Sequence, residues 1–202
     1  MSDLGVLLPF LMFTIVMTGT PGSNNLMVLM SGARVGVLRT MPLVCGIALG
    51  IGLQLAIVGS GLGSAFERIP GFHTALSVVG AAYILWLAWA IANSGPLQMQ
   101  VDPKPPMGLI SGAAFQWINP KAWALSISVA ATYIPPENHF LNLCIAAVIL
   151  AAISMPCVGV WALGGLTFRR WLGRPRIASA FNASMAVILV VATMPAVLNL
   201  SI

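Results

Sequence analysis

The stretch "FTIVMTGTPGSNNLMVLM", Phe13–Met30, lies in the first long apolar run of the chain and carries Pro21, Gly22 and two asparagines where a membrane helix would be continuous. A proline removes an amide donor and clashes with the preceding turn, so it frees a carbonyl and lets a new helix begin after it. Membrane helices tolerate ordinary proline kinks. Whether "TPGSNN" is a kink or a site therefore depends on the rest of the sequence.

The composition indicates an integral membrane protein. Of the 202 residues, 59% are hydrophobic and 6% are charged, whereas soluble domains carry roughly 25% charged residues. A spanning helix needs about 20 mainly apolar residues. Runs of this kind cover roughly 4–30, 40–64, 73–93, 107–134, 140–166 and 177–200. They are apolar all round instead of alternating, which argues against barrel strands. The sequence thus predicts an all-α membrane protein with six transmembrane helices.

The basic residues predict how the chain is oriented. Most of them fall between predicted spans one and two, three and four, or five and six: Arg34, Arg39, Lys104, Arg169, Arg170, Arg174 and Arg176. Those three loops share one side, which the positive-inside rule assigns to the cytoplasm, so both termini are expected outside. The net charge of +5 is then a topology signal, and no nucleic-acid partner is expected. The cysteines have no neighbouring histidine, so we expect neither a metal site nor a cofactor.

The chain divides into two halves. A proline-rich segment, 94–106, separates a first repeat, 1–93, from a second, 107–202, within one membrane domain. Each half holds three predicted spans, and because three is odd, the second half enters the membrane from the opposite face. Inverted repeats with interrupted helices at corresponding positions are a recurring plan of transporters. The fourth span is interrupted at "NPK", Asn119–Lys121, which corresponds to Thr20–Gly22 in the first.

The two interruptions resemble starts of half-helices. Thr20 and Asn119 each precede a proline, and the order of a polar cap followed by proline is typical of a helix N-terminus. Inverted halves would direct both starts at the membrane midplane, forming a pocket that suits an anion such as a carboxylate. Asn24 and Asn25 follow the first break and point about 100° apart on a helix. We expect Asn24 to face the pocket.

Lys121 is the ionisable residue at this position. It lies roughly 20 Å from either end of its span, where a lysine costs about 2.5–3.5 kcal/mol on insertion scales and by default indicates a functional site. The alternative is a structural lysine that only ties the break together by binding freed carbonyls. Gln54, the main polar residue of span two, either lines the cavity or makes one interhelical hydrogen bond.

Small residues at GxxxG spacing predict close helix contacts. The pairs are Gly32 and Gly36, Gly46 and Gly50, and Gly108 and Gly112. Packing alone is a sufficient explanation for them.

Four motifs carry a resemblance to a known family: "TPGSNN", "GIALG" from Gly46, "GAAYILWLAWAIA" from Gly80 and "NPKAW" from Asn119. Over nearly its whole length the chain resembles the LysE/RhtB superfamily of bacterial amino-acid exporters, and spans three and four look closest to the cysteine and O-acetylserine branch. Two positions depart from the family pattern. Ser23 stands where the motif usually reads TPGPN, and Ile51 stands where many members carry an aspartate.

The resemblance implies efflux of small amino acids or their derivatives across the bacterial inner membrane, coupled to protons. The resemblance implies these substrate-binding residues at its motif positions: Thr20, Pro21, Gly22, Asn24, Asn119, Pro120 and Lys121. Gln54 is added to them as a candidate from its polar character in span two. No Asp or Glu falls in a predicted span, which leaves the coupling group open. A passive channel is the alternative function, because broken helices also line pores. An enzyme is not expected, and a homo-oligomer is compatible with the sequence.

Overall fold

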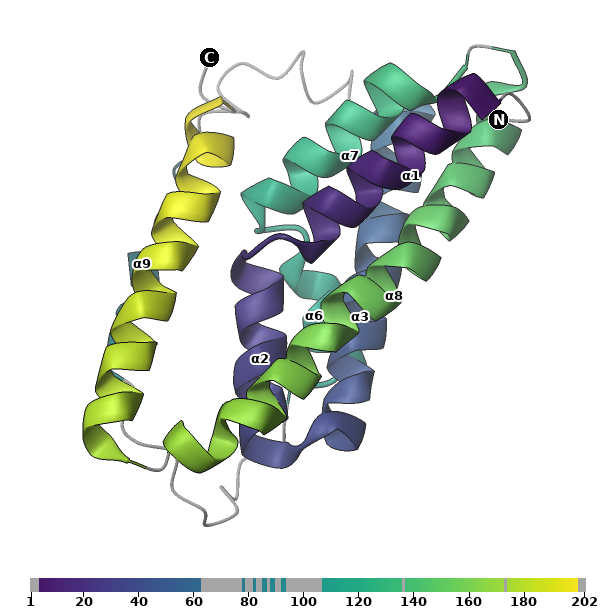
Figure 1. Cartoon of the computed structure of the whole chain (residues 1–202). Helices are drawn as coiled ribbons and strands as arrows, with labels where there is room; N and C mark the ends of the chain where they lie inside the picture. Colours follow the sequence, from purple (N-terminus) through teal and green to yellow (C-terminus); the bar gives the residue numbers. More distant parts are fainter. Residues whose placement is uncertain are drawn as a thin grey trace.

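The computed structural model describes residues 4–62, 107–135, 137–172 and 174–199, with eight separate positions between 78 and 93. The predicted third span and the linker 94–106 therefore lie largely outside the described residues. In the described ranges the regular elements are helices: α1 (Leu4–Gly19), α2 (Ser23–Val35), α3 (Val37–Ile57), the short π-helix η1 (Val58–Leu62), α6 (Leu109–Phe115), α7 (Pro120–Tyr133), α8 (His139–Leu172) and α9 (Pro175–Asn199). The helix α1 begins and α9 ends at the same end of the bundle (Figure 1).

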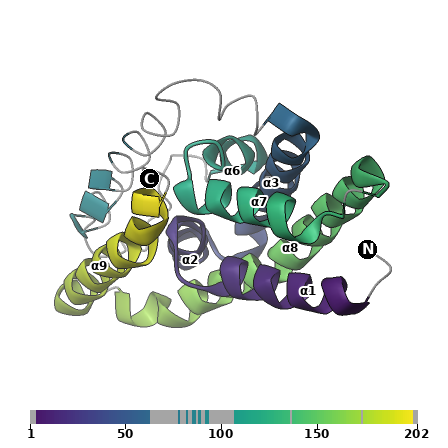
Figure 2. The same ribbon diagram turned by 90° about the horizontal axis from the view of Figure 1, so that it is seen from above.

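The long helix α8 crosses the whole bundle and packs against both α2 and α3 (Figure 1). Seen from above, α2 lies in the middle, with α1, α8, α9 and α7 around it (Figure 2). The buried core includes Phe10, Leu43, Ile47, Leu143 and Leu150. Large apolar side chains also cover the outside of α1, α3 and α8. An apolar core with an equally apolar exterior is what a bundle surrounded by lipid requires.

Two helical stretches are long and apolar enough to cross a membrane alone: Val37–Gly61, formed by α3 and most of η1, and His139–Thr167 in α8. The pair α1 and α2 qualifies as a third span when taken together, and it bends by 54° at its break. In the part of the chain that the structure describes, α6 and α7 are each shorter than a span. These observations agree with the predicted all-α membrane class, whereas the six-span arrangement stays a prediction.

Glycines allow two pairs of helices to approach backbone to backbone. A Cβ added at Gly32 of α2 would strike the backbone of Ala162, and one added at Gly165 of α8 would strike the backbone of Leu29. The helices α3 and α6 meet in the same way through Gly46 and Gly112, with Gly50 against Ala113. The prediction of close contacts was wrong for Gly36 and Gly108, which face open space. Gly36 instead has a φ of 85° and forms the turn between α2 and α3.

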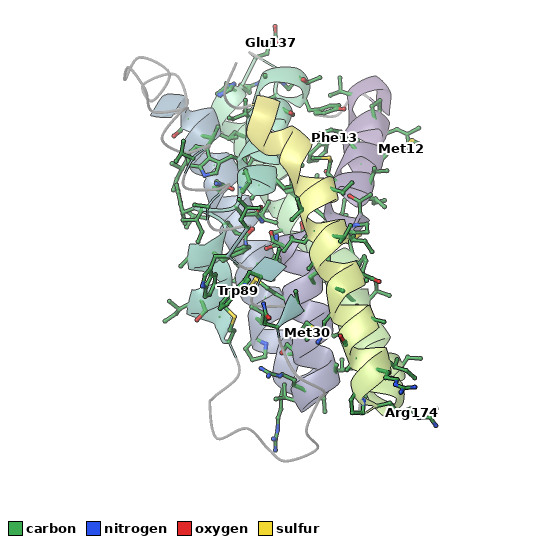
Figure 3. All side chains as sticks on the ribbon, turned by 90° about the vertical axis from the view of Figure 1, so that its left-hand side faces the viewer. Met12, Phe13, Met30, Trp89, Glu137 and Arg174 are labelled. Atoms are coloured by element: carbon green, nitrogen blue, oxygen red, sulfur yellow. The ribbon has the colours of Figure 1, made fainter. Side chains whose placement is uncertain are left out.

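The described basic residues of the predicted loops gather at one end of the bundle. Arg34 and Arg39 flank the junction of α2 and α3, while Arg174 and Arg176 lie at the junction of α8 and α9. Figure 3 shows Arg174 at the end opposite Glu137. The structure therefore groups these cations on one side, as the sequence predicts.

Candidate functional site

The first break separates α1 from α2. Thr20 still belongs to the end of α1, because its amide N–H donates to the carbonyl of Val16 at 3.0 Å. The N-cap of α2 is Gly22, without a side-chain capping bond, and Ser23 is the first helical residue. The prediction that Thr20 caps the second half-helix and that Pro21 begins it was therefore wrong by two residues.

Side chains from α2 and α8 bind carbonyls that this break frees. Asn25 Nδ2 donates to the carbonyl oxygens of Thr18 at 2.9 Å and Thr20 at 2.6 Å. From α8, Trp161 Nε1 donates to the carbonyl of Gly19 at 3.2 Å. These bonds replace the helical bonds that Pro21 and the bend remove, so the break is a defined structure and not a frayed helix.

The second break separates α6 from α7. The chain turns through Gln116–Asn119 with hydrogen bonds between residues three apart, such as Gln116 N–H to the carbonyl of Ala113 at 3.2 Å. Asn119 is the N-cap of α7, its Oδ1 accepts from the Lys121 amide at 3.1 Å, and Pro120 is the first helical residue. Here the predicted order of cap and proline is confirmed.

Lys121 joins the two breaks. Its Nζ donates to Thr20 Oγ1 at 2.8 Å, to the Thr20 carbonyl at 3.1 Å and to the Pro21 carbonyl at 3.3 Å. In the described ranges of the chain these acceptors are all neutral, so the cation binds dipoles and not a counter-ion. The lysine also packs closely against position 22, where an added Cβ would lie 3.2 Å from Lys121 Cδ and would require that side chain to shift slightly. The extended backbone of Gly22, with φ −178°, would suit any residue.

A small pocket lies where the breaks meet. The lining residues come from both breaks and from α1, α3 and α8: Met17, Thr18, Gly22, Ser23, Asn24, Asn25, Ile51, Asn119, Lys121, Ala122, Leu125 and Val158. Of the predicted site residues, Gly22, Asn24, Asn119 and Lys121 are in this set. Thr20 and Pro21 are not in it, but their carbonyls bind Lys121. Pro120 and Gln54 are also outside the lining set.

Gln116 is a buried polar residue that the sequence does not single out. It is fully buried and pairs with Asn24 through two amide bonds, Asn24 Nδ2 to Gln116 Oε1 at 3.0 Å and Gln116 Nε2 to Asn24 Oδ1 at 3.1 Å. Gln54 Nε2 donates to the Gln116 carbonyl at 3.1 Å. Of the two alternatives for Gln54, the structure therefore shows the interhelical hydrogen bond.

The two asparagines after the first break share the pocket. Asn24 lines the pocket as expected, and Asn25, which the 100° spacing placed on another face, lines it as well. Both belong to the first turn of α2, which begins at the pocket, so both side chains stay close to it.

Gln116 had one signal in the sequence, namely its position as an isolated amide in an apolar run three residues before Asn119.

Comparison with known proteins identifies the family. The sequence matches the LysE type translocator family over residues 15–199. The chain belongs to this family. Proteins named cysteine/O-acetylserine efflux protein are 34% identical in Salmonella typhi, over 80% of this chain and 83% of the relative, and 32% identical in Klebsiella pneumoniae, over 80% and 82%. No solved structure matches the chain significantly. The family makes the chain a membrane transporter and not an enzyme.

Proposed function

We propose that this protein exports small amino acids or their derivatives, such as cysteine or O-acetylserine, across the bacterial inner membrane. The names of relatives 31–34% identical to it support this class of substrate. The observation that carries the proposal is the Lys121 ammonium, which lies at the junction of two broken helices and binds only neutral acceptors among the described residues. A cation within a membrane span that lacks a counter-ion is suited to an anionic ligand group.

The substrate carboxylate takes the place of the neutral acceptors of Lys121. The bonds from the ammonium to Thr20 and Pro21 are already charge-assisted, but a carboxylate adds the attraction between two full opposite charges, so the exchange favours the bound state. The N-termini of α2 and α7 both lie at the pocket. The first turn of a helix presents N–H groups without intrahelical partners and the positive end of the helix dipole. Both contributions favour the same negatively charged group.

The two breaks fit a pair of inverted three-helix repeats, 1–93 and 107–202, joined by the linker 94–106. Each half has a helix broken at a proline, followed by a long helix, α3 in the first half and α8 in the second. Broken helices at corresponding positions are the mark of substrate sites in such transporters. Alternating access then arises as one half moves against the other around the pocket.

Proton coupling can use Lys121 itself. In the described part of the chain no Asp or Glu lines the pocket, and none falls in a predicted span. With substrate absent, the lysine holds a proton taken up from the outside while its Nζ binds the carbonyls. It releases this proton when the pocket opens to the cytoplasm, so that proton entry drives export, and a carboxylate that binds before the release opposes it.

Net export from right-side-out membrane vesicles tests this function. Vesicles loaded with radiolabelled L-cysteine are expected to show saturable efflux against a higher external concentration when the outside is made acidic, and a protonophore should abolish that uphill movement. Vesicles prepared without the protein are the control. Efflux that does not saturate and stops at equal concentrations would instead identify a passive channel.

The orientation has its own test. In a variant without Cys45, Cys144 and Cys157, Arg174→Cys should react with an impermeant thiol reagent only after the cells are permeabilised, because the basic end of the bundle is expected in the cytoplasm. Glu137→Cys, at the opposite end (Figure 3), should react in intact cells and is the matched control. Labelling of position 174 from outside would reverse the proposed topology.

A further inference from the structure

Two polar atoms at the pocket are buried without a hydrogen-bond partner, the Oγ of Ser23 and the Oδ1 of Asn25. Ser23 is 1% exposed and Asn25 is 2% exposed. Of the four unpartnered buried polar side-chain atoms in the described residues, these two belong to pocket-lining residues. A buried polar atom without a partner destabilises a folded protein, so native structures rarely keep one without a reason. A ligand in the pocket would supply the missing partners.

The orientation of the Asn25 amide is determined by its neighbours. Its Nδ2 donates to the carbonyls of Thr18 and Thr20. A flipped amide would place Oδ1 against two carbonyl oxygens, which are also acceptors, and would lose both bonds. The Oδ1 atom is therefore the one that remains for the pocket, and as an acceptor it requires a donor from the ligand.

Ser23 adds a second acceptor, because it lies two residues before Asn25 and lines the same pocket. It is the first residue of α2, and no side chain caps this helix. Asn24, which lies between the two, already uses both ends of its amide to bind Gln116. Its neighbours on either side therefore provide the free polar atoms of this helix start.

We propose that Ser23 Oγ and Asn25 Oδ1 bind the α-ammonium of a zwitterionic substrate whose carboxylate is held by Lys121. This inference rests on the proposed function and makes its substrate class more specific. The neutral acceptors suit an ammonium that brings its own carboxylate, because that carboxylate screens the ammonium from Lys121. An acid without an amino group would leave both acceptors unpaired, and an amine without a carboxylate would be repelled by the lysine.

The rest of the pocket restricts the substrate side chain. Ile51, Leu125 and Val158 supply an apolar wall, and Lys121 is the one charged residue of the described lining. A cationic side chain, such as that of lysine, would bring a second positive charge to a pocket without a carboxylate to bind it. The expected substrates are therefore α-amino acids with a free amino group and a short, uncharged side chain.

Binding of L-cysteine and of β-mercaptopropionate to the purified full-length protein tests the inference. The second compound is L-cysteine without its amino group, so it keeps the carboxylate and the thiol. The wild-type protein should bind L-cysteine at least about tenfold more tightly, as expected for a hydrogen-bonded charge. Ser23→Ala should lower this ratio by weakening L-cysteine binding alone. Asn25→Leu should lower it as well, and because it also removes the bonds to Thr18 and Thr20, it should weaken the binding of both compounds. Ser184→Ala, on α9 with its hydroxyl bound to the Ala180 carbonyl, should leave the ratio unchanged.

Ser23→Ala also separates a binding role from a structural one. Because its hydroxyl has no partner, its removal should leave the melting temperature unchanged or slightly higher, and this variant decides the question if Asn25→Leu fails to fold. Equal affinities for the two compounds in the wild-type protein, or wild-type ratios in the folded variants, would overturn the inference. Failure of the wild-type protein to bind or export either compound would instead overturn the proposed function, and this inference with it.

Discussion

Replacing Lys121 with methionine is expected to lower the rate of export at least about hundredfold, the loss that follows when one member of a buried charge pair is truncated. Methionine retains most of the length of the side chain but cannot bind a carboxylate or carry a proton. The measurement is uphill efflux of L-cysteine from vesicles, normalised to the amount of folded protein in the membrane. Lys104→Met, at the other lysine of the sequence, is the control and should export normally.

The Lys121 variants also test the structural alternative, in which the lysine only ties the breaks together through Thr20 and Pro21. If Lys121→Met is folded but inactive, the charge serves transport. Lys121→Arg keeps the charge but does not release a proton in the physiological range, so it should exchange substrate across the membrane and fail to accumulate it against a gradient. Normal export by Lys121→Met would show that the residue is structural and that the site assignment fails.

Substitution of Gly165 with alanine is expected to destabilise the fold strongly, although it adds only one methyl group. The new Cβ would overlap the backbone of Leu29 and Ala33 on α2, and backbone atoms cannot move aside as a flexible side chain can. Separating α2 from α8 would disturb the bundle centre and the start of α2 at the pocket. Overpacking of this kind costs about 1–3 kcal/mol and sometimes more, which is a large part of a typical stability of about 5–15 kcal/mol.

Gly164→Ala is a matched control for this change. The two positions are adjacent on α8, the substitution is identical, and a Cβ at Gly164 has no neighbouring atom within 4 Å. We expect Gly164→Ala to keep the wild-type yield and melting temperature in detergent, and Gly165→Ala to have a clearly lower melting temperature and yield. Equal behaviour of the two variants would show that α2 and α8 do not approach as closely as described.

The sequence was most informative where a residue type was rare for its surroundings. Lys121, Asn119 and Pro120 stood out because charge, amide and proline are unusual within a membrane span, and the structure places them at a real helix break. The bounds of the apolar run 177–200 also agree closely with those of the helix α9, Pro175–Asn199, because the helix extends as far as the apolar residues continue.

Other features depend on partners that are distant in sequence. The N-cap of α2 is Gly22 and not the predicted Thr20, because the carbonyls of Thr20 and Pro21 bind Lys121 from another helix. Local capping rules do not include such a contact between helices. Gln116 was missed because its importance comes from pairing with Asn24. Gly165 was missed because an isolated glycine gives no indication of which backbone it faces.

A structure of the full-length protein with L-cysteine bound would show whether Lys121 receives the substrate carboxylate where the two breaks meet. We expect a carboxylate oxygen within about 3 Å of Lys121 Nζ, with the bonds from this nitrogen to the Thr20 and Pro21 carbonyls broken. A carboxylate bound elsewhere, with Lys121 Nζ still held by those carbonyls, would contradict it.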